Sequence, residues 1–519
     1  MAGKIKEIID HIIQERSRGN PDIAEVTKAK FILKGINPNK FSSDSADDAD
    51  IINKLLAIAK QLNVEILEGA SSNIKSVVSM EINEEEAVQD IKNQLKGFNV
   101  KLLVFFASSC FNQARMSHLM QAAFKDSIVF GCSTAGEIAN GAFLKNAIVA
   151  TAFHSNIIAD AKVEVIEQMQ KGLRVEAAFS SFETYFRESC YTMDVTRYLG
   201  IVLIDGISMK EERLMDRIGN RSNVYFVGGS AGDDGKYDRT FVYANGRAYA
   251  DSAVLVLIKM NDEASFDILK TQSYKALNDK LIATKVNEET REVMEFNNKP
   301  AILAYAEAVG ASSIEEATKY FTTHPVGLII GGNDIFVRSP RERNGTNIKF
   351  YCNLLQGMEV TLLEATDIVQ DTKDALEKKM HAPEKIEGLL HFQCVQRTQA
   401  LEKNNLVKEY GEIFKGIPNS GFSTYGEEYI GHMNQTSTML IFKTNAIRST
   451  SSSCNLEELA DGILSHHERW HGNRYPMGSK GEAIPRIARI LAIADSYAAM
   501  TSDRVYQSTL SKEEAMGEE

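Results

Sequence analysis

The sequence predicts a mixed α/β to α+β protein with two related halves, each built on a mixed sheet, and helical segments at both ends. Short apolar runs alternate with amphipathic helical patterns between residues 71 and 447, which indicates strands and helices packed in layers. One seven-residue motif occurs twice in that region, about 290 residues apart, which indicates homologous halves rather than a short-period solenoid. The expected parts are a helical leader (1–70), a first half (71–297), a second half (298–447), a linker (448–460) and a short helical fragment (461–519).

Three amphipathic helical patterns make up the leader. The first is an isoleucine stripe over residues 5–13, and Gly19-Asn20-Pro21 ends it. A second pattern covers residues 23–33 and a third covers 51–62. Because such helices must bury their apolar faces, we expect them to cap the next domain or to mediate self-association. Binding of a signalling partner protein is the alternative.

Strand-length apolar runs and two helical patterns define the region between leader and linker. The expected helices cover 113–124 and 211–218. A boundary between the halves is expected in the polar helical stretch 297–313, and the composition of Arg448–Ser453 (RSTSSS) is typical of a linker. The expected strands cover 102–107, 128–130, 147–153, 199–204, 224–227, 253–258, 326–330 and 439–442.

Composition disfavours several classes of protein. The formal net charge of −12 argues against general binding to nucleic acid or to anionic membranes. No run approaches the ~20 apolar residues that a membrane-spanning helix needs. Residues 1–19 lack the features of a signal peptide, so we expect a cytoplasmic protein. The six cysteines lie far apart and form no CxxC pair, which indicates reduced thiols rather than disulfides or a zinc site.

The repeated motif is Gly131–Glu137 (GCSTAGE) in one half and Gly421–Glu427 (GFSTYGE) in the other. A third glycine-rich run, Gly228–Gly235 (GGSAGDDG), directly follows an expected strand. Glycines let backbone amides approach a bound group closely, and the hydroxyl and carboxyl side chains beside them can contact a ligand. The same glycines also suit a tight turn, so turn formation and ligand contact both remain open. None of the runs has the spacing of a Walker loop or a dinucleotide fold, which argues against a nucleotide cofactor.

We expect the two repeated loops to meet across a pseudo-symmetric interface and to form one pocket with the third run, because pockets favour such interfaces. A thiol function of Cys132 or Cys394 is disfavoured, because no histidine lies near either in the sequence and Phe422 stands at the position of Cys132 in the other copy. The expected ligand contacts are Ser133, Thr134, Glu137, Ser230, Asp233, Arg397, Ser423, Thr424 and Glu427.

These motifs, together with HPVGLIIGG (324–332) and the segment from GFSTYGE to MLIF (421–442), resemble the N- and C-terminal halves of FIST domains. The resemblance covers roughly residues 75–445, and TKAKFILKGINP (27–38) is similar to the leader of FIST-containing bacterial signalling proteins. It implies a cytoplasmic sensor of a small ligand, with an amino acid as one candidate, that regulates an attached or partner output. One departure is Gln393, where relatives usually have asparagine.

The last residues resemble the C-terminal part of HD-GYP phosphodiesterases, through HHERW (466–470), Tyr475-Pro476 and IPRIARILAIADSYAAMTSDRVY (484–506). The resemblance implies that His466, His467 and Asp495 are remnants of a site for divalent iron or manganese that hydrolyses cyclic di-GMP. The upstream His-Asp pair of that family is absent, and His471 and Arg474 replace the family's aspartate and glycine. We therefore expect a sensor that requires no cofactor, and a cyclic di-GMP phosphodiesterase is the alternative.

Overall fold

The structure is a computed structural model that describes most of the chain. It covers residues 4–17, 21–42, 72–330, 334–380 and 384–445, together with positions 45, 48, 51, 54, 55, 58, 59, 481 and 484. By its internal contacts the chain divides into residues 1–445 and residues 446–519. Among the described residues, no helix is both long enough and apolar enough to cross a membrane.

The leader forms its expected helices, α1 (Lys4–Ser17) and α2 (Pro21–Leu33), followed by a 3-10 turn η1 (Pro38–Lys40). The isoleucine stripe of α1 is buried and packs against Phe31 and Ile36. Leu55, Ile58 and Ala59, which are helical and belong to the third expected pattern, are buried in the same cluster. The stripe of α1 is thus buried within the leader, whereas Ile23, Val26 and Ile32 of the second expected pattern are exposed.

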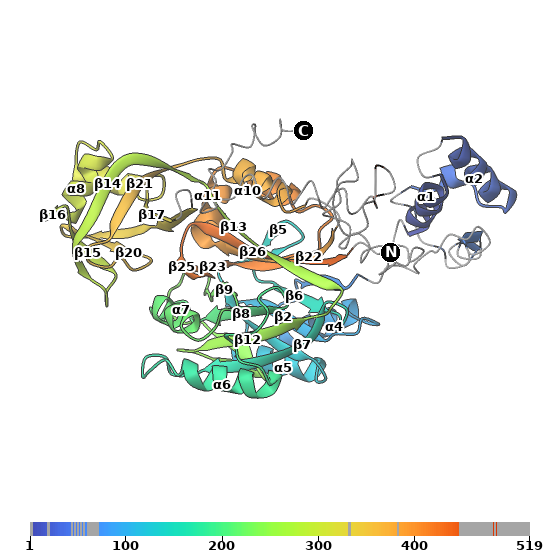
Figure 1. The fold of residues 1–519 in the computed structure, drawn as a ribbon, viewed down its shortest axis with the longest axis horizontal. Coiled ribbons are helices and arrows are strands. Elements are labelled where there is room, and N and C mark those ends of the chain that lie inside the picture. Colours follow the sequence, from blue (N-terminus) through green and yellow to red (C-terminus); the bar gives the residue numbers. More distant parts are fainter. Residues whose placement is uncertain are drawn as a thin grey trace. The chain divides into compact units, whose positions relative to one another are not determined.

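Residues 74–445 contain three copies of one β-α-β-α-β unit, each followed by a short hairpin and a closing strand (Figure 1). The first copy comprises β1 (Ile74–Ser79), α4 (Glu84–Gln94), β2 (Leu102–Ser108), α5 (Gln113–Ala123), β3 (Ile128–Thr134), β4 (Glu137–Ala139), β5 (Ala142–Leu144) and β6 (Ile148–Phe153). The second comprises β7 (Ile158–Ile166), α6 (Val175–Phe186), β8 (Tyr198–Ile204), α7 (Glu211–Gly219), β9 (Phe226–Ser230), β10 (Val242–Ala244), β11 (Arg247–Tyr249) and β12 (Ala253–Met260). The third comprises β13 (Ala264–Gln272), α10 (Ile368–Glu377), β22 (Glu384–Cys394), α11 (Val395–Lys403), α12 (Val407–Glu412), β23 (Asn419–Thr424), β24 (Glu427–Tyr429), β25 (Gly431–Met433) and β26 (Thr436–Asn445).

The copies exchange their hairpins in a cycle. The sheet orders are β1-β6-β2-β3-β10-β11, β7-β12-β8-β9-β24-β25 and β13-β26-β22-β23-β4-β5. In each sheet four strands come from one copy and the last two are the hairpin of another copy. Each sheet has one parallel pair (β2/β3, β8/β9 or β22/β23) among antiparallel neighbours. The mixed sheets predicted from the sequence are confirmed, and strand pairing interlocks all three copies.

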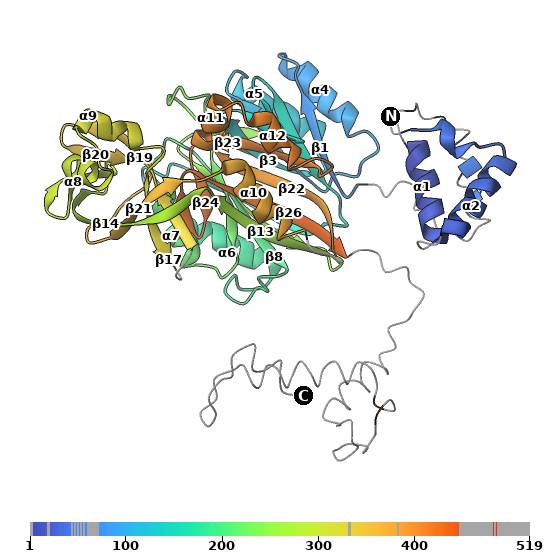
Figure 2. The same cartoon turned by 90° about the horizontal axis from the view of Figure 1, so that it is seen from above.

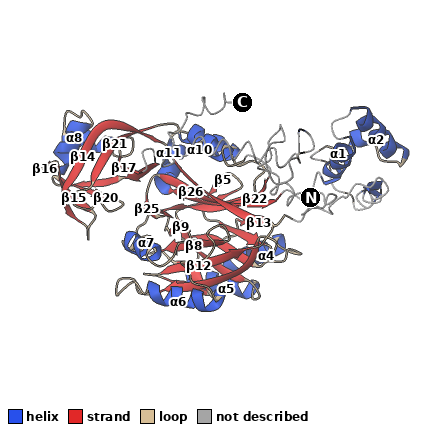
Figure 3. Cartoon of the chain, in the orientation of Figure 1, coloured by secondary structure: helices blue, strands red, loops and turns tan. Residues whose placement is uncertain are grey.

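The main core lies between the inner faces of the three sheets, and helices cover the outer faces (Figures 1 and 3). Its aromatic contacts join the first and third copies: the Phe106 and Phe422 rings are 4.7 Å apart and the Phe153 and Phe442 rings 4.8 Å. Helices α4 and α5 pack on the first sheet, and α6 and α7 on the second. Figure 2 shows α10, α11 and α12 over the third sheet, where they share a cluster with β26.

An insertion of residues 274–365, here called the insertion lobe, separates β13 from α10 in the third copy. It has its own eight-stranded sheet and its own apolar cluster. The expected boundary between residues 297 and 298 falls between β15 and β16 of this lobe. Its elements are β14 (Tyr274–Asn287), β15 (Glu292–Phe296), β16 (Lys299–Pro300), α8 (Ala301–Ala308), α9 (Ile314–Ala317), η2 (Thr318–Tyr320), β17 (Val326–Ile330), β18 (Asp334–Arg338), β19 (Pro340–Asn344), β20 (Asn347–Phe350) and β21 (Glu359–Ala365).

The strands and helices predicted between leader and linker are confirmed. The eight expected strands correspond to β2, β3, β6, β8, β9, β12, β17 and β26, and the two expected helices to α5 and α7.

Candidate functional site

Three glycine-rich loops meet at one junction, because each follows the second strand of a parallel pair and leads into an exchanged hairpin. The GGSAGDD run is a third copy of the motif, so Ser133, Ser230 and Ser423 occupy equivalent positions at the ends of β3, β9 and β23. We call residues 133–137, 230–235 and 423–427 the three-loop junction. Backbone hydrogen bonds join the loops from Ala135 N to Ser423 O (3.2 Å), Ser423 N to Gly136 O (2.8 Å), Ser230 N to Gly426 O (2.8 Å), Tyr425 N to Ser230 O (3.2 Å) and Gly232 N to Ser133 O (3.0 Å).

The first glycine of each motif allows two strands to approach closely. A Cβ built on Gly131 would lie 1.8 Å from the carbonyl oxygen of Phe105 on the neighbouring parallel strand. The equivalent distances are 1.7 Å at Gly228 and 1.7 Å at Gly421. No side chain fits at such a distance, so this part of the motif is explained by packing rather than by ligand contact.

Two of the motif serines form hydrogen bonds that connect neighbouring segments at the junction. Ser133 Oγ donates to Gly232 O at 2.8 Å and accepts from Phe241 N at 3.0 Å. Ser230 Oγ donates to Glu428 Oε1 at 3.2 Å. Both serines are buried, so their hydroxyls hold neighbouring segments in place.

The motif glutamates are buried acids in matching settings. Thr134 Oγ1 donates to Glu137, and Thr424 Oγ1 donates to Glu427. The second oxygen of each carboxyl accepts from a backbone amide at the start of the closing strand, at 3.2 Å in both copies. Burial raises the pKa of Glu137 to about 8 and that of Glu427 to about 7, although these hydrogen bonds act in the opposite direction. Near neutral pH, Glu137 therefore carries a proton and can donate a hydrogen bond.

Asp233 and Arg397 have structural partners. Asp233 accepts from the hydroxyl of Tyr425 and from three following backbone amides at 2.7 to 3.0 Å. Burial opposes ionisation of Asp233, but these hydrogen bonds outweigh it and lower its pKa. Arg397 donates to Ser273 Oγ and Thr372 Oγ1, each at 3.0 Å, within the third copy.

A cavity of about 330 Å³ opens at the junction. Its buried polar floor consists of Glu137, Thr398 and Ser423, and the hydroxyl oxygens of Thr398 and Ser423 are 2.8 Å apart. We call it the three-loop cavity. Its exposed charged side chains are Lys145, Asp234, Lys236 and Glu402, and its other lining residues are Cys110, Ala135, Gly136, Phe143, Leu144, Asn146, Gly235, Val395 and Gln399.

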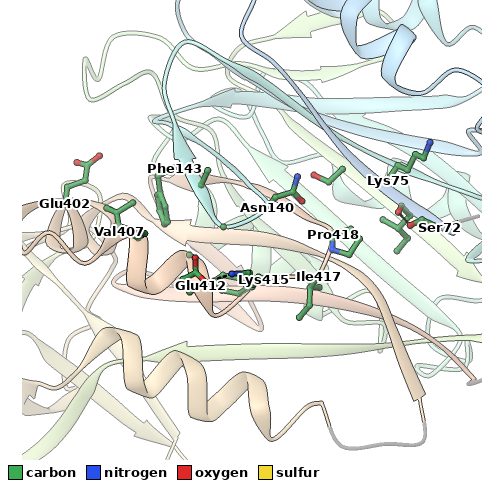
Figure 4. A pocket seen from close by; sticks show the side chains of 18 of the residues that line it. Ser72, Lys75, Asn140, Phe143, Glu402, Val407, Glu412, Lys415, Ile417 and Pro418 are labelled. Atoms are coloured by element: carbon green, nitrogen blue, oxygen red, sulfur yellow. Dashed lines mark hydrogen bonds and ion pairs between the residues drawn. The ribbon is translucent and has the colours of Figure 1, made fainter. Parts of the chain in front are cut away.

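A wider groove of about 1030 Å³ lies beside the cavity, between the start of β1, the turn of the β4–β5 hairpin and the segment from α12 to β23 (Figure 4). Phe143 and Glu402 line both spaces, so the hairpin and the end of α11 form a shared wall. The hairpin packs on α12 through two glycines: a Cβ on Gly141 would lie 2.3 Å from the carbonyl oxygen of Gly411.

Comparison with protein families assigns the central region. The FIST N domain matches residues 101–299 and the FIST C domain matches residues 301–429. The chain is a FIST-domain protein. An HD domain matches residues 411–518, so FIST N, FIST C and HD segments follow in that order. The first part of the HD match falls on α12 and on strands β23 to β26 of the FIST module, of which β23 and β26 belong to the third sheet and β24 and β25 to the second.

The relatives of this FIST protein match it in separate parts. An uncharacterized protein of Methanocaldococcus jannaschii is 24% identical over 302 residues, which is 55% of this chain and 57% of the relative. A probable cyclic di-GMP phosphodiesterase of Vibrio cholerae is 50% identical over 52 residues, 10% of this chain and 12% of the relative. A cyclic di-GMP phosphodiesterase of Thermotoga maritima is 46% identical over 72 residues, 14% and 20% respectively. The chain thus spans little more than half of the first relative and a small part of the others, and its FIST and HD segments are the domain composition of a signal-transduction sensor.

All nine residues predicted as ligand contacts are at most 2% exposed. Glu137 and Ser423 line the three-loop cavity, and the other seven do not. The expected approach of the loops is therefore seen, while four of the nine side chains bond to one another, Thr134 to Glu137 and Thr424 to Glu427. Their roles as ligand contacts stay a prediction.

Several residues that line the three-loop cavity were not predicted from the sequence. For one of them, Asp234, the sequence does contain a signal. Asp234 takes the position of Glu137 and Glu427 when GGSAGDD is aligned as a third motif copy, whereas Asp233 lies where the others have glycine. Thr398, Gln399 and Glu402 share one face of α11, since they follow at helical spacing, but nothing in the sequence places that face at the junction.

The cysteines of the FIST module are free, with Cys110 exposed and Cys132, Cys190, Cys352 and Cys394 buried. Burial raises the pKa of Cys132 and of Cys394, which disfavours a thiolate at either site. Four of the five described cysteines are therefore buried thiols, and none of the five forms a disulfide.

We predict that brief treatment of the native protein with iodoacetamide modifies Cys110 and leaves Cys132 and Cys394 unmodified, because the reagent needs an accessible thiolate. Peptide mass mapping with and without denaturant measures this. Rapid modification of Cys132 in the native protein would contradict this prediction and would support a thiol function at the junction.

The expected metal ligands His466, His467 and Asp495 lie outside the described residues. Within the described part of the chain, no group of three or more histidine, cysteine, aspartate or glutamate side chains could hold a metal ion.

Proposed function

We propose that the FIST module is the input domain of a signalling protein and binds a small ligand with both a positive and a negative group, such as an amino acid, in the three-loop cavity. The observation that carries this proposal is the cavity itself. All three copies of the repeat contribute to it, and it combines a polar floor with charges of both signs. Its volume of about 330 Å³ lies at the small end of ligand pockets.

The charges around the cavity suit a zwitterion. Lys145 and Glu402 are 3.8 Å apart, and their side chains are 71% and 41% exposed, so a ligand can replace this weak ion pair. Asp234 and Lys236 face the cavity from the loop of the second copy. A ligand carboxylate would bind the lysines and its ammonium group the acids, while the hydroxyls of Thr398 and Ser423 orient it.

A ligand bound there would contact three segments of the module: the base of the β4–β5 hairpin, residues 234–236 and α11. It would favour the arrangement in which all three contact it, which shifts the population toward one conformation. The hairpin and α11 also line the groove, so this shift would change the groove and the segments or partner proteins that contact it. We place this sensor in the cytoplasm, because five free cysteines fit a reducing compartment.

The test is a thermal-shift screen of the full chain against the twenty common amino acids at millimolar concentration. A ligand of the native state raises Tm by mass action, by an amount that grows with concentration. Thr398→Val should abolish the shift, because it removes a floor hydroxyl at nearly constant volume. Thr184→Val, on the exposed face of α6, is the matched control. Equal shifts in both variants would contradict the cavity as the site.

The alternative function rests on the HD match and on the phosphodiesterase relatives. The upstream part of that match is folded as strands β23 to β26 of the FIST module, so only residues 446–518 remain for an HD segment. A catalytic metal site needs about three protein ligands, and phosphodiester chemistry usually needs a second ion. His466, His467 and Asp495 are too few for two ions.

We predict that the purified chain with Mn²⁺ or Fe²⁺ does not hydrolyse cyclic di-GMP. Chromatography of the nucleotides after overnight incubation measures this, with an active phosphodiesterase as the positive control. Metal-dependent hydrolysis that disappears in His466→Ala would make the enzyme the leading function.

A further inference from the structure

The outer face of the third sheet carries two polar side chains where the other two sheets are apolar. Across the parallel strands, the first glycine and the serine of each motif pair with two residues of the neighbouring strand. These residues are Phe105 and Ala107 on β2, Val202 and Ile204 on β8, and His391 and Gln393 on β22. The first two pairs belong to the apolar clusters under α4 to α7. The repeated unit therefore does not require the polar pair, which indicates a separate role for it.

His391 and Gln393 are fully buried beneath the helices that cover the third sheet (Figure 2). The His391 ring packs beside the rings of Tyr410 and Phe414. His391 Nε2 lies 2.8 Å from the hydroxyl oxygen of Ser437 on β26, and the Tyr410 hydroxyl of α12 donates to Gln393 Oε1 at 3.1 Å. These contacts use one polar atom of each side chain.

Arg397 brings a positive charge to the same region. Its side chain is only 2% exposed, and its two terminal nitrogens donate to Ser273 Oγ and Thr372 Oγ1, each at 3.0 Å. None of the ion pairs in the described part of the chain includes this arginine. A buried charge is costly unless an opposite charge accompanies it, so the guanidinium lacks its expected counter-charge.

The register of the third sheet places Arg397 close to the polar pair. Gln393 pairs with Ser437 on β26, and Ser437 pairs with Thr271 on β13. Ser273, which accepts from Arg397, lies two residues beyond Thr271. The guanidinium therefore lies over the same end of the sheet as the Gln393 side chain.

The charge of Arg397 also reaches His391. Burial and this charge lower the pKa of His391 to about 3, against the effect of its hydrogen bond to Gln393. The imidazole is therefore neutral near neutral pH. The group formed by these three side chains carries one net positive charge.

Each of the three side chains has a buried nitrogen without a hydrogen-bond partner among the described residues. The atoms are His391 Nδ1, Gln393 Nε2 and Arg397 Nε. The amide and guanidinium nitrogens can only donate. A buried donor without an acceptor is costly, and such a group in a native protein commonly marks a bound water molecule or ion. Water would supply an acceptor but would leave the charge uncompensated, whereas an anion supplies both.

We propose that the third copy contains a buried site for one small inorganic anion, with chloride as the simplest example, between Arg397, Gln393 and His391. We call it the anion site. The anion accepts from Arg397 Nε and Gln393 Nε2 and neutralises the guanidinium. None of the three side chains lines the three-loop cavity, so the anion site does not depend on what binds there.

The position of Arg397 gives the anion a structural effect. Arg397 lies on α11 immediately before Thr398, which forms part of the cavity floor. It also links α11 to Thr372 of α10 and to Ser273 after β13. By neutralising Arg397, the anion stabilises these contacts and holds α11 on the third sheet. The folded chain should therefore be more stable when chloride is present.

Thermal unfolding of the full chain at constant ionic strength tests the anion site. Sodium chloride is varied from zero to 100 mM, and sodium gluconate, whose anion is too large for the site, replaces it. Chloride that binds the native state raises Tm by mass action, and the rise should be about 5 °C at a hundredfold excess over Kd. Gluconate alone should give no rise.

Two variants with matched controls locate the effect. Arg397→Met removes the charge and should abolish the chloride-dependent rise. Gln393→Glu supplies a carboxylate in place of the anion, so it should be as stable in gluconate as the wild type in chloride and should not respond further. The controls Arg115→Met and Gln89→Glu change exposed residues of the first copy and should keep the wild-type response.

Gln393→Glu keeps the test decisive if Arg397→Met does not fold, because it adds a counter-charge instead of removing one. Crystals of the wild type grown in bromide should show an anomalous peak beside Arg397 and Gln393. A wild-type Tm that does not depend on chloride, together with no such peak, would show that water fills the site and would overturn the proposal. A chloride response that persists in Gln393→Glu would place the anion elsewhere and would overturn it as well.

Discussion

Replacing Gly421 with alanine is expected to lower the free energy of unfolding by more than about 3 kcal/mol, one of the larger effects that single substitutions produce. The new Cβ would lie 1.7 Å from the carbonyl oxygen of His391, which pairs with Gly421 across the parallel strands. Neither backbone can move without breaking the ladder that carries the loop into the junction. Urea unfolding followed by far-UV circular dichroism measures the loss.

Gly219→Ala is the matched control, because its Cβ would have no atom within 4 Å at the end of α7. Alanine there should be neutral or slightly stabilising, since glycine is the poorer helix former. Gly131→Ala and Gly228→Ala should match Gly421→Ala, because they hold the equivalent position. An unfolding midpoint for Gly421→Ala equal to that of Gly219→Ala would contradict the close approach of the strands.

The second large effect concerns pH and the buried acid Glu137. The folded chain keeps a proton on Glu137 up to about pH 8, whereas the unfolded chain releases it near 4.5. Between these values the folded state binds more protons, so its stability falls as pH rises. The loss through this one group is on the order of 4 kcal/mol.

Glu137→Gln should remove this loss, because the amide is neutral at every pH and can still bond to Thr134 and accept from the backbone. Compared with the wild type, the variant should gain stability progressively from pH 5 to pH 8, as measured by urea unfolding at each pH. Glu427→Gln should do the same over a narrower range, with its gain complete near pH 7. Exposed Glu359→Gln should leave the pH profile unchanged, and a wild-type profile in Glu137→Gln would show that the acid is ionised in the folded state.

Local sequence was sufficient for the elements of the fold. Continuous apolar runs such as 102–107 and 253–258 predict strands that are buried on both faces. The corresponding strands β2 and β12 are buried along nearly their whole length. The isoleucine stripe of α1 and the turn residues after it determined the first helix in the same way. These features depend on residues that are close in the chain, so they can be predicted without a structure.

The candidate site could be predicted from the sequence only in part. The repeated motif marked the junction, because a close strand approach demands glycine wherever the unit recurs. It did not separate contact residues from packing residues: Ser133 and Asp233 share the chemistry of ligand-binding groups but are used to tie loops together. Thr398 and Glu402 line the cavity from α11. The sequence does not show which part of the protein that face of the helix contacts.

The sequence by itself determined that this is a FIST protein of mixed sheets with a helical leader, since strand periods, glycine positions and the motif repeat are local properties. Tertiary structure alone decided that there are three copies, that their hairpins exchange in a cycle, and that Arg291 meets Glu211 and Glu212. The physical reason is that a hairpin such as β4–β5 offers the same hydrogen bonds to any strand edge. Only the combined packing of all three sheets selects β23 as its partner, and with it the shape of the cavity.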